Sequence, residues 1–170
     1  IQRIHFDYLV CTVPLGVLKT GQPHFSPALP DAIAASISRL GVGLLHKTYL
    51  LWEESDWPKV TVPARIIYPT DHCNTFAFVL NLGDERYHGP GLFGYCAYAC
   101  YPWAAQAELL GTEELTDKFM SVLEEALDDG SEVVIPRPKN VLVSSWLHDP
   151  LSLGAYSAQR VGSPMSDFDA

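Results

Sequence analysis

The chain has 170 residues, a mass of 18.8 kDa and 48% hydrophobic residues, which suits one domain, or a large piece of one, with a sizeable core. Its formal net charge of −9 argues against nucleic acid as a direct partner, because binding to phosphates needs a basic surface. No run of about 18 apolar residues occurs, so the sequence predicts no membrane span.

The N-terminal part is predicted to hold a strand, a loop and a helix. Phe6–Val13 is almost continuously apolar and β-prone, which predicts a strand that is buried on both faces. Gly21–Pro30 contains three Pro and is predicted to be an extended loop. Asp31–Leu40 has apolar residues at helical spacing, with Asp31 as the predicted N-cap and Gly41 as the residue that ends the helix.

The remainder is predicted to be a sheet with helices. Leu44–Glu53 is predicted to be a strand, and Thr112 is predicted to cap a long helix that ends near Asp129. The other expected elements are a helical turn or helix at Trp103–Leu110 and strands at Arg65–Tyr68, Thr75–Leu82, Leu92–Cys100 and Val141–Trp146. This order indicates an α+β fold, in which helices cover one face of a mixed or antiparallel sheet.

The four cysteines are expected to be buried free thiols, with zinc or a disulfide as the less favoured alternatives. Cys96 and Cys100 would share one face of a strand but lie too far apart for a bond. Asp71-His72-Cys73 is interpreted as a polar turn, because a metal site needs three or four converging ligands and no H-E-x-x-H spacing occurs. We therefore predict no metal site.

Lys47 is unusual because it lies within a predicted apolar strand. Strand alternation places it on one face with Leu45, Tyr49 and Leu51. An amine on an apolar face is costly unless it is hydrated, paired or neutral. Two explanations remain open from the pattern alone: an edge-strand lysine that reaches water, or a functional amine.

Three segments together resemble one family, the flavin-containing monoamine and polyamine oxidases, which include the lysine-specific histone demethylases. The segments are Tyr8–Lys19 (YLVCTVPLGVLK) followed by Phe25–Pro30 (FSPALP), Arg39–Lys47 (RLGVGLLHK) followed by Trp57-Pro58, and Ser145–Ser157 (SWLHDPLSLGAYS) followed by Val161–Ser163. Their order and spacing make the resemblance specific, and it covers nearly the whole chain.

The resemblance implies a division of the chain. Residues 1–20 would belong to an FAD-binding domain, residues 21–140 to the substrate-binding domain, and residues 141–170 to a strand and return segment at the FAD site. The family's G-x-G-x-x-G dinucleotide motif does not occur in this sequence. The implied partners are therefore a small-molecule amine substrate and the remainder of the FAD domain.

The resemblance also implies roles for single residues. Lys47 matches the lysine that holds a water against flavin N5, while a hydride equivalent leaves the carbon next to the substrate nitrogen. Tyr156 matches a wall of the aromatic cage through which the amine approaches; on pattern alone, Tyr156 and Trp146 would be core aromatics. Leu151 departs from the family, because many relatives carry Tyr or Trp there. Contacts to FAD are implied for Thr12, Val13, Pro14, Trp146, Ala155 and Tyr156.

Three functions follow as expectations. The first is part of an FAD-dependent amine oxidase that oxidises polyamines or related amines to an imine and then an aldehyde, with release of hydrogen peroxide. The second is a histone-lysine demethylase of the same family. The third is a noncatalytic, stand-alone substrate domain that binds no flavin.

Overall fold

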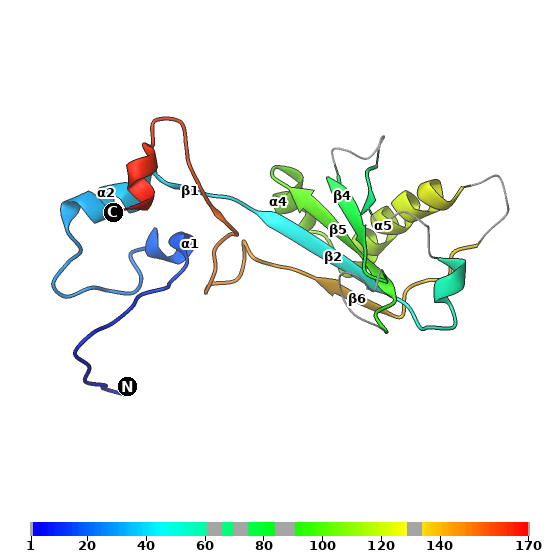
Figure 1. Cartoon of the computed structure of the whole chain (residues 1–170), viewed down its shortest axis with the longest axis horizontal. Helices are drawn as coiled ribbons and strands as arrows, with labels where there is room; N and C mark the ends of the chain where they lie inside the picture. Colours follow the sequence, from blue (N-terminus) through cyan, green and yellow to red (C-terminus); the bar gives the residue numbers. More distant parts are fainter. Residues whose placement is uncertain (1, 61–65, 70–74, 84–90, 129–133, 170) are drawn as a thin grey trace.

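A five-stranded antiparallel sheet forms one end of the molecule (Figure 1). The computed structural model describes residues 2–60, 66–69, 75–83, 91–128 and 134–169. The strand order is β3-β4-β5-β2-β6, with β2 at Leu45–Leu51, β3 at Ile66–Ile67, β4 at Phe78–Asn81, β5 at Gly94–Cys100 and β6 at Asn140–Val143. The predicted α+β fold, with helices over one face of an antiparallel sheet, is confirmed.

Helices α4 (Trp103–Ala107) and α5 (Thr112–Leu127) cover one face of this sheet. Between them and the strands lies an apolar core in which several side chains have no exposed surface. The ring centroids of Phe76 and Phe119 are 5.5 Å apart in this core. Each fully buried side chain of this kind contributes about 1.5–3 kcal/mol, so hydrophobic burial holds this end together. The short 3-10 helix η1 (Trp57–Lys59) packs on its border.

The opposite face of the sheet is apolar and aromatic but less buried. Strand alternation in β2 buries His46 and Thr48 toward the helices and turns Lys47 and Tyr49 to the opposite face. Tyr98 of β5 is paired with Lys47 and stacks on Phe78 of β4, with 4.4 Å between the ring centroids. Lys47 therefore stands on an aromatic surface that helices α4 and α5 do not cover.

The other end of the molecule is built from short elements (Figure 1). They are α1 (Leu15–Leu18), α2 (Asp31–Arg39), the antiparallel pair β1 (Gly41–Val42) and β7 (Ser157–Ala158), and η2 (Met165–Phe168). The carboxylate of Asp167 closes this end, because it accepts hydrogen bonds from Arg39, Ser36 and Ser163. The Arg39 guanidinium holds the pKa of that carboxyl well below its usual range.

The predicted strand at Phe6–Val13 is wrong. Residues 2–14 form no helix or strand, and the side chains of Tyr8 and Val10 are 93% and 84% exposed. A strand needs a neighbouring strand for its backbone hydrogen bonds, and the structure pairs no described residue with this segment. The apolar side chains of this segment therefore lie on the surface of the chain and not in its core.

The prediction that the cysteines are buried is wrong for Cys11 and Cys100. Cys96 is buried, but Cys11 and Cys100 are exposed, because Cys11 lies on the exposed N-terminal segment and Cys100 ends β5. Helix α2 packs against η2 at the far end and does not cover the sheet. Cys73 lies outside the described residues.

The N-terminal ends of α2 and α5 differ from the predictions by one residue. Pro30 and Gly111 are the N-caps, so Asp31 and Thr112 are the first helical residues and make no capping hydrogen bond. Gly41 does not adopt the left-handed conformation of a helix-ending glycine, since it opens β1. A Cβ there would lie 2.8 Å from the exposed side chain of Arg160 and 3.2 Å from the carbonyl oxygen of Ala158, so a larger residue would crowd the strand pair.

Two expectations concern absences. Among the described residues, no helix is both long and apolar enough to cross a membrane. Within the same ranges, no group of three or more His, Cys, Asp or Glu side chains is placed to hold a metal ion. The segment Asp71-His72-Cys73 lies outside the described residues.

Candidate functional site

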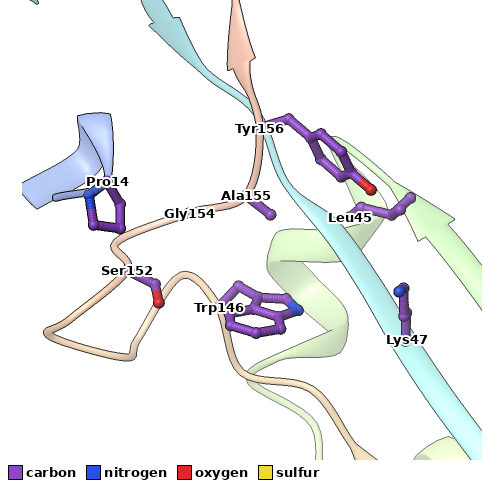
Figure 2. Close-up of a pocket in the computed structure, with 8 residues that line it drawn as sticks. All are labelled: Pro14, Leu45, Lys47, Trp146, Ser152, Gly154, Ala155 and Tyr156. Carbon is purple, nitrogen blue, oxygen red and sulfur yellow. The ribbon is translucent and has the colours of Figure 1, made fainter. Parts of the chain in front are cut away.

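A pocket of about 300 Å³ lies between the two ends of the molecule (Figure 2). Four separate parts of the chain line it: the start of α1, strand β2, the turn after β6 and the segment that leads into β7. The lining residues are Pro14, Leu45, Lys47, Trp146, Ser152, Gly154, Ala155 and Tyr156. Most of this surface is apolar or aromatic, and Lys47 supplies a cationic amine.

The groups around Lys47 stay neutral near pH 7. Its amine lies 5.3 Å from the ring centroid of Tyr98. Burial raises the pKa of Tyr98 to about 12 and that of the neighbouring Cys96 thiol to about 11. Burial also lowers the pKa of His46, the residue before Lys47 on the strand. Lys47 therefore projects from an uncharged surface into the pocket.

The backbone of β2 is joined to the turn that carries Trp146. The N–H of Lys47 donates a hydrogen bond of 2.8 Å to the hydroxyl of Ser144, whose own N–H donates to the Lys47 carbonyl at 2.9 Å. The N–H of Gly154 then donates to the carbonyl of Trp146 at 2.7 Å. These bonds tie the lysine, the indole and the next segment into one backbone network.

The segment before β7 passes close to the start of β2. Gly43 donates to the carbonyl of Tyr156 and accepts from the N–H of Ala155, both at 2.8 Å. A Cβ at Gly154 would lie 2.4 Å from Val42, so this crossing admits no side chain there. Tyr156 itself has a φ of 70°, a left-handed conformation that is rare for a bulky residue. The crossing thus presents the Tyr156 ring, which is 71% exposed, at the pocket.

The pocket brings together five of the residues that the sequence analysis singled out. They are Pro14, Lys47, Trp146, Ala155 and Tyr156. Thr12 and Val13 immediately precede Pro14 but do not line the pocket. Leu151 is 77% exposed in the turn beyond Trp146 and does not line it either.

The sequence analysis missed several residues of the site. Leu45 and Ser152 line the pocket, Ser144 holds the Lys47 backbone, and Glu108 bonds to the turn at Trp146. Strand alternation had placed Leu45 on the same face as Lys47, but without assigning it to a site. Ser144 and Glu108 act through contacts across 97 and 38 residues, which no local pattern reveals.

Comparison with known proteins decides the family. The family described as flavin containing amine oxidoreductase matches residues 2–170. The chain belongs to this family of flavin-containing amine oxidoreductases. The resemblance stated from the three sequence segments is therefore confirmed.

Relatives within the family include two named activities. The chain is 39% identical over 163 residues to Polyamine oxidase 5 of Oryza sativa subsp. japonica, covering 96% of this chain and 31% of that protein. It is 33% identical over 171 residues to Lysine-specific histone demethylase 1 homolog 1 of Arabidopsis thaliana, covering 99% of this chain and 19% of that protein. The chain thus spans a third or less of the length of these relatives.

A solved structure supports the fold. Wild-type putrescine oxidase, in a structure with putrescine bound, superposes with a TM-score of 0.67 at 18% sequence identity. The match covers 89% of this chain and 31% of that one. At this identity the likeness shows that the two share a fold across most of the present chain.

Proposed function

We propose that this chain is part of an FAD-dependent amine oxidase that oxidises polyamines or related amines to an imine, with water giving the aldehyde and oxygen giving hydrogen peroxide. The observation that carries the proposal is that Lys47, Trp146, Ala155 and Tyr156, from distant parts of the chain, line the same pocket. The similarity to a relative named polyamine oxidase favours polyamines among the amines.

The chemistry of the lining fits part of a flavin. A planar, largely apolar ring suits a pocket walled by an indole, a phenol and aliphatic side chains. The sequence contains no glycine-rich dinucleotide loop, so the phosphate-binding part of an FAD site must come from elsewhere in the parent protein. We accordingly propose that the remainder of the FAD domain covers the exposed apolar surface next to the pocket.

We extend this to the organisation of the chain. Residues 1–20 and 141–170 would border the FAD domain, and residues 21–140 would form the substrate-binding domain. The exposed apolar side chains of the N-terminal segment, Ile4, Phe6, Tyr8, Leu9 and Val10, support such a border, because exposed apolar patches mark interaction surfaces.

Lys47 would be the catalytic amine. Bound FAD would supply the hydride acceptor, and the protein's part is to position water and exclude bulk solvent. An amine on an uncharged aromatic surface can hold a water by donating a hydrogen bond to it, with few competing partners. In that position it would assist proton transfer during turnover.

The other lining residues would bind and orient. Trp146 would pack beside the flavin ring, and Tyr156 would face the incoming amine, whose cationic form is attracted to an aromatic face. Ala155 and Pro14 would approach the flavin through their backbone, together with Thr12 and Val13. The half-exposed indole, 43% exposed in this chain, supports a partner group at that face.

Replacing Lys47 by Met in the full-length protein tests the proposal. Met keeps the length and apolar packing of the side chain but removes the amine, so turnover or flavin reoxidation is expected to slow about tenfold or more. Stopped-flow measurement of both half-reactions separates the two steps. The melting temperature should change little, because Met supplies similar packing.

Lys59→Met is the matched control, because Lys59 is exposed on η1 and far from the lining residues. It should leave both half-reactions unchanged. If Lys47→Met behaves like Lys59→Met in both half-reactions and in melting temperature, Lys47 is only a strand residue.

A histone demethylase is the second candidate, favoured by the 33% identity to a relative of that name. Oxygen consumption with spermine, spermidine and a methylated histone peptide discriminates the two. If the protein oxidised the peptide but neither polyamine, the proposed function would be histone demethylation and not polyamine oxidation. A full-length protein with no flavin absorbance band would instead support a noncatalytic domain.

The proposal also predicts weak flavin binding by this chain alone, since it lacks the phosphate-binding loop. Titration of FAD should show no binding at micromolar concentrations.

A further inference from the structure

Glu108 is a carboxylate with no exposed side-chain surface, at the end of α4. It is the C-cap of that helix, where the helix dipole disfavours an anion. A carboxylate buried at this place therefore needs strong donors from another part of the chain.

The turn after β6 provides those donors. The N–H of Trp146 donates to Oε1 of Glu108 at 2.9 Å, and the N–H of Leu147 donates to Oε2 at 3.0 Å. Nδ1 of His148 lies 3.1 Å from the same Oε2. One side chain thus binds two consecutive backbone amides and the imidazole that follows them.

The two peptide groups that flank the Cα of Trp146 are both hydrogen-bonded. Its N–H is bound by Glu108, and its carbonyl accepts from the N–H of Gly154. Glu108 itself follows α4, which packs against β2 and β5. The charge of Glu108 also reaches His46 of β2, where it opposes the effect of burial on the imidazole pKa.

We propose that Glu108 is a positioning residue for the pocket: its carboxylate fixes the backbone of Trp146, and with it the indole, at a set place relative to Lys47. Ser144 anchors the same segment to Lys47 from the other side of the turn. A displacement of about 1 Å at a reacting centre can lower rates by about 100-fold, so this anchoring matters for turnover. The inference rests on the proposed function in that the pocket is taken to be the amine-oxidising site.

The test is Glu108→Gln in the full-length protein. Gln offers an oxygen to one of the two N–H groups but turns its own amide donor toward the other, so one bond is lost. Hydrogen–deuterium exchange of the peptide covering residues 145–149 should speed up about tenfold or more at Trp146 or Leu147. In the flavin-loaded enzyme, kcat should fall about tenfold, while KM changes by less than about threefold.

Two variants serve as references. Glu124→Gln makes the same chemical change on the exposed face of α5, so exchange at residues 145–149 and kcat should stay at the parental values. His148→Ala removes the imidazole but keeps both N–H bonds, so it should leave the exchange close to the parental rate. Circular dichroism checks that each variant folds. If Glu108→Gln does not fold, Glu108→Asp, which retracts the carboxylate by one methylene, replaces it with the same expected changes.

The results separate this inference from the proposed function. Exchange in Glu108→Gln that matches Glu124→Gln overturns the inference, whether or not the enzyme is active. Exchange accelerated equally by His148→Ala also overturns it, because the imidazole and not the amide pair would then hold the turn. Faster exchange with an unchanged kcat in an active enzyme overturns it too. Faster exchange in a parent without amine oxidase activity supports the anchoring of Trp146 and refutes the proposed function.

Discussion

The two ends of the molecule are held together by different forces. At the sheet end, side chains such as Tyr95, Phe76 and Phe119 have no exposed surface and pack between β-sheet and helices. At the other end, the carboxylate of Asp167 bonds to α2 and to Ser163, while Val161 and Met165 remain exposed. The pocket lies between them, so one wall stands on a strand of the packed sheet and the other on the short segments that adjoin the polar end.

This difference between the two ends indicates which parts of the pocket can move independently. Lys47 and Leu45 belong to a strand that is paired on both sides and anchored in the core. Pro14, Ala155 and Tyr156 belong to segments with few buried apolar contacts. Loss of the polar network is therefore expected to loosen the second wall before the first.

The largest effect is expected from the core. Phe119→Ala removes a fully buried ring that packs on Phe76, which should lower the free energy of unfolding by about 3–5 kcal/mol. Urea denaturation followed by circular dichroism measures the loss. Leu142→Ala is the reference on the sheet's open face, where the side chain is 57% exposed and the loss should be below about 1 kcal/mol. Equal losses for the two variants would contradict the comparison.

Thiol labelling should separate the two regions by about 100-fold in rate. Cys96 is buried in the sheet and burial raises the pKa of its thiol to about 11, so little reactive thiolate forms at pH 8. Cys11 lies on the exposed N-terminal segment. Iodoacetamide labelling, resolved by mass spectrometry for each site, should modify Cys11 long before Cys96. Similar rates would mean that the sheet opens readily or that the N-terminal segment is covered.

Asp167→Asn should have a smaller and pH-dependent effect. The bond from Arg39 lowers the pKa of the Asp167 carboxyl, so its contribution is full above the unfolded value of about 3.9 and is lost as the pH falls toward the folded value. The variant should melt at a lower temperature than the parent at pH 7. This difference should shrink as the pH is lowered below about 4, as measured by thermal melts from pH 7 to pH 3. A difference that grows in acid would contradict the role of this carboxylate.

The sequence predicted the regular parts of the fold because their side chains repeat at the period of the element. β2, β5 and α5 lie where alternation and the helical stripe placed them. β1 and β7 have only two residues each, too few for any period, and pair across 117 positions from Gly41 to Ala158. The segment at residues 6–13 failed for another reason, since apolarity does not say which surface will cover a stretch of chain.

Much of the candidate site was also predictable, but from resemblance more than from local patterns. Lys47 stood out because a charge interrupts an apolar strand, whereas nothing local marked Trp146 or Tyr156 as pocket residues. The role of Glu108 could not be predicted from the sequence, because its carboxylate binds two backbone amides of a turn that is distant in the chain. A sequence pattern reveals a residue that breaks the periodicity of its own helix or strand. It does not reveal contacts between residues of different elements.

The left-handed backbone at Tyr156 has a consequence for how this position can change. A bulky residue with a φ of 70° adds about 1–3 kcal/mol of local strain, which Asn would tolerate more easily. Selection for stability alone would therefore replace the tyrosine. Tyr156 therefore lowers the stability of the backbone but places an aromatic ring at the pocket. Gly and Asn, which tolerate a left-handed backbone, have no aromatic ring.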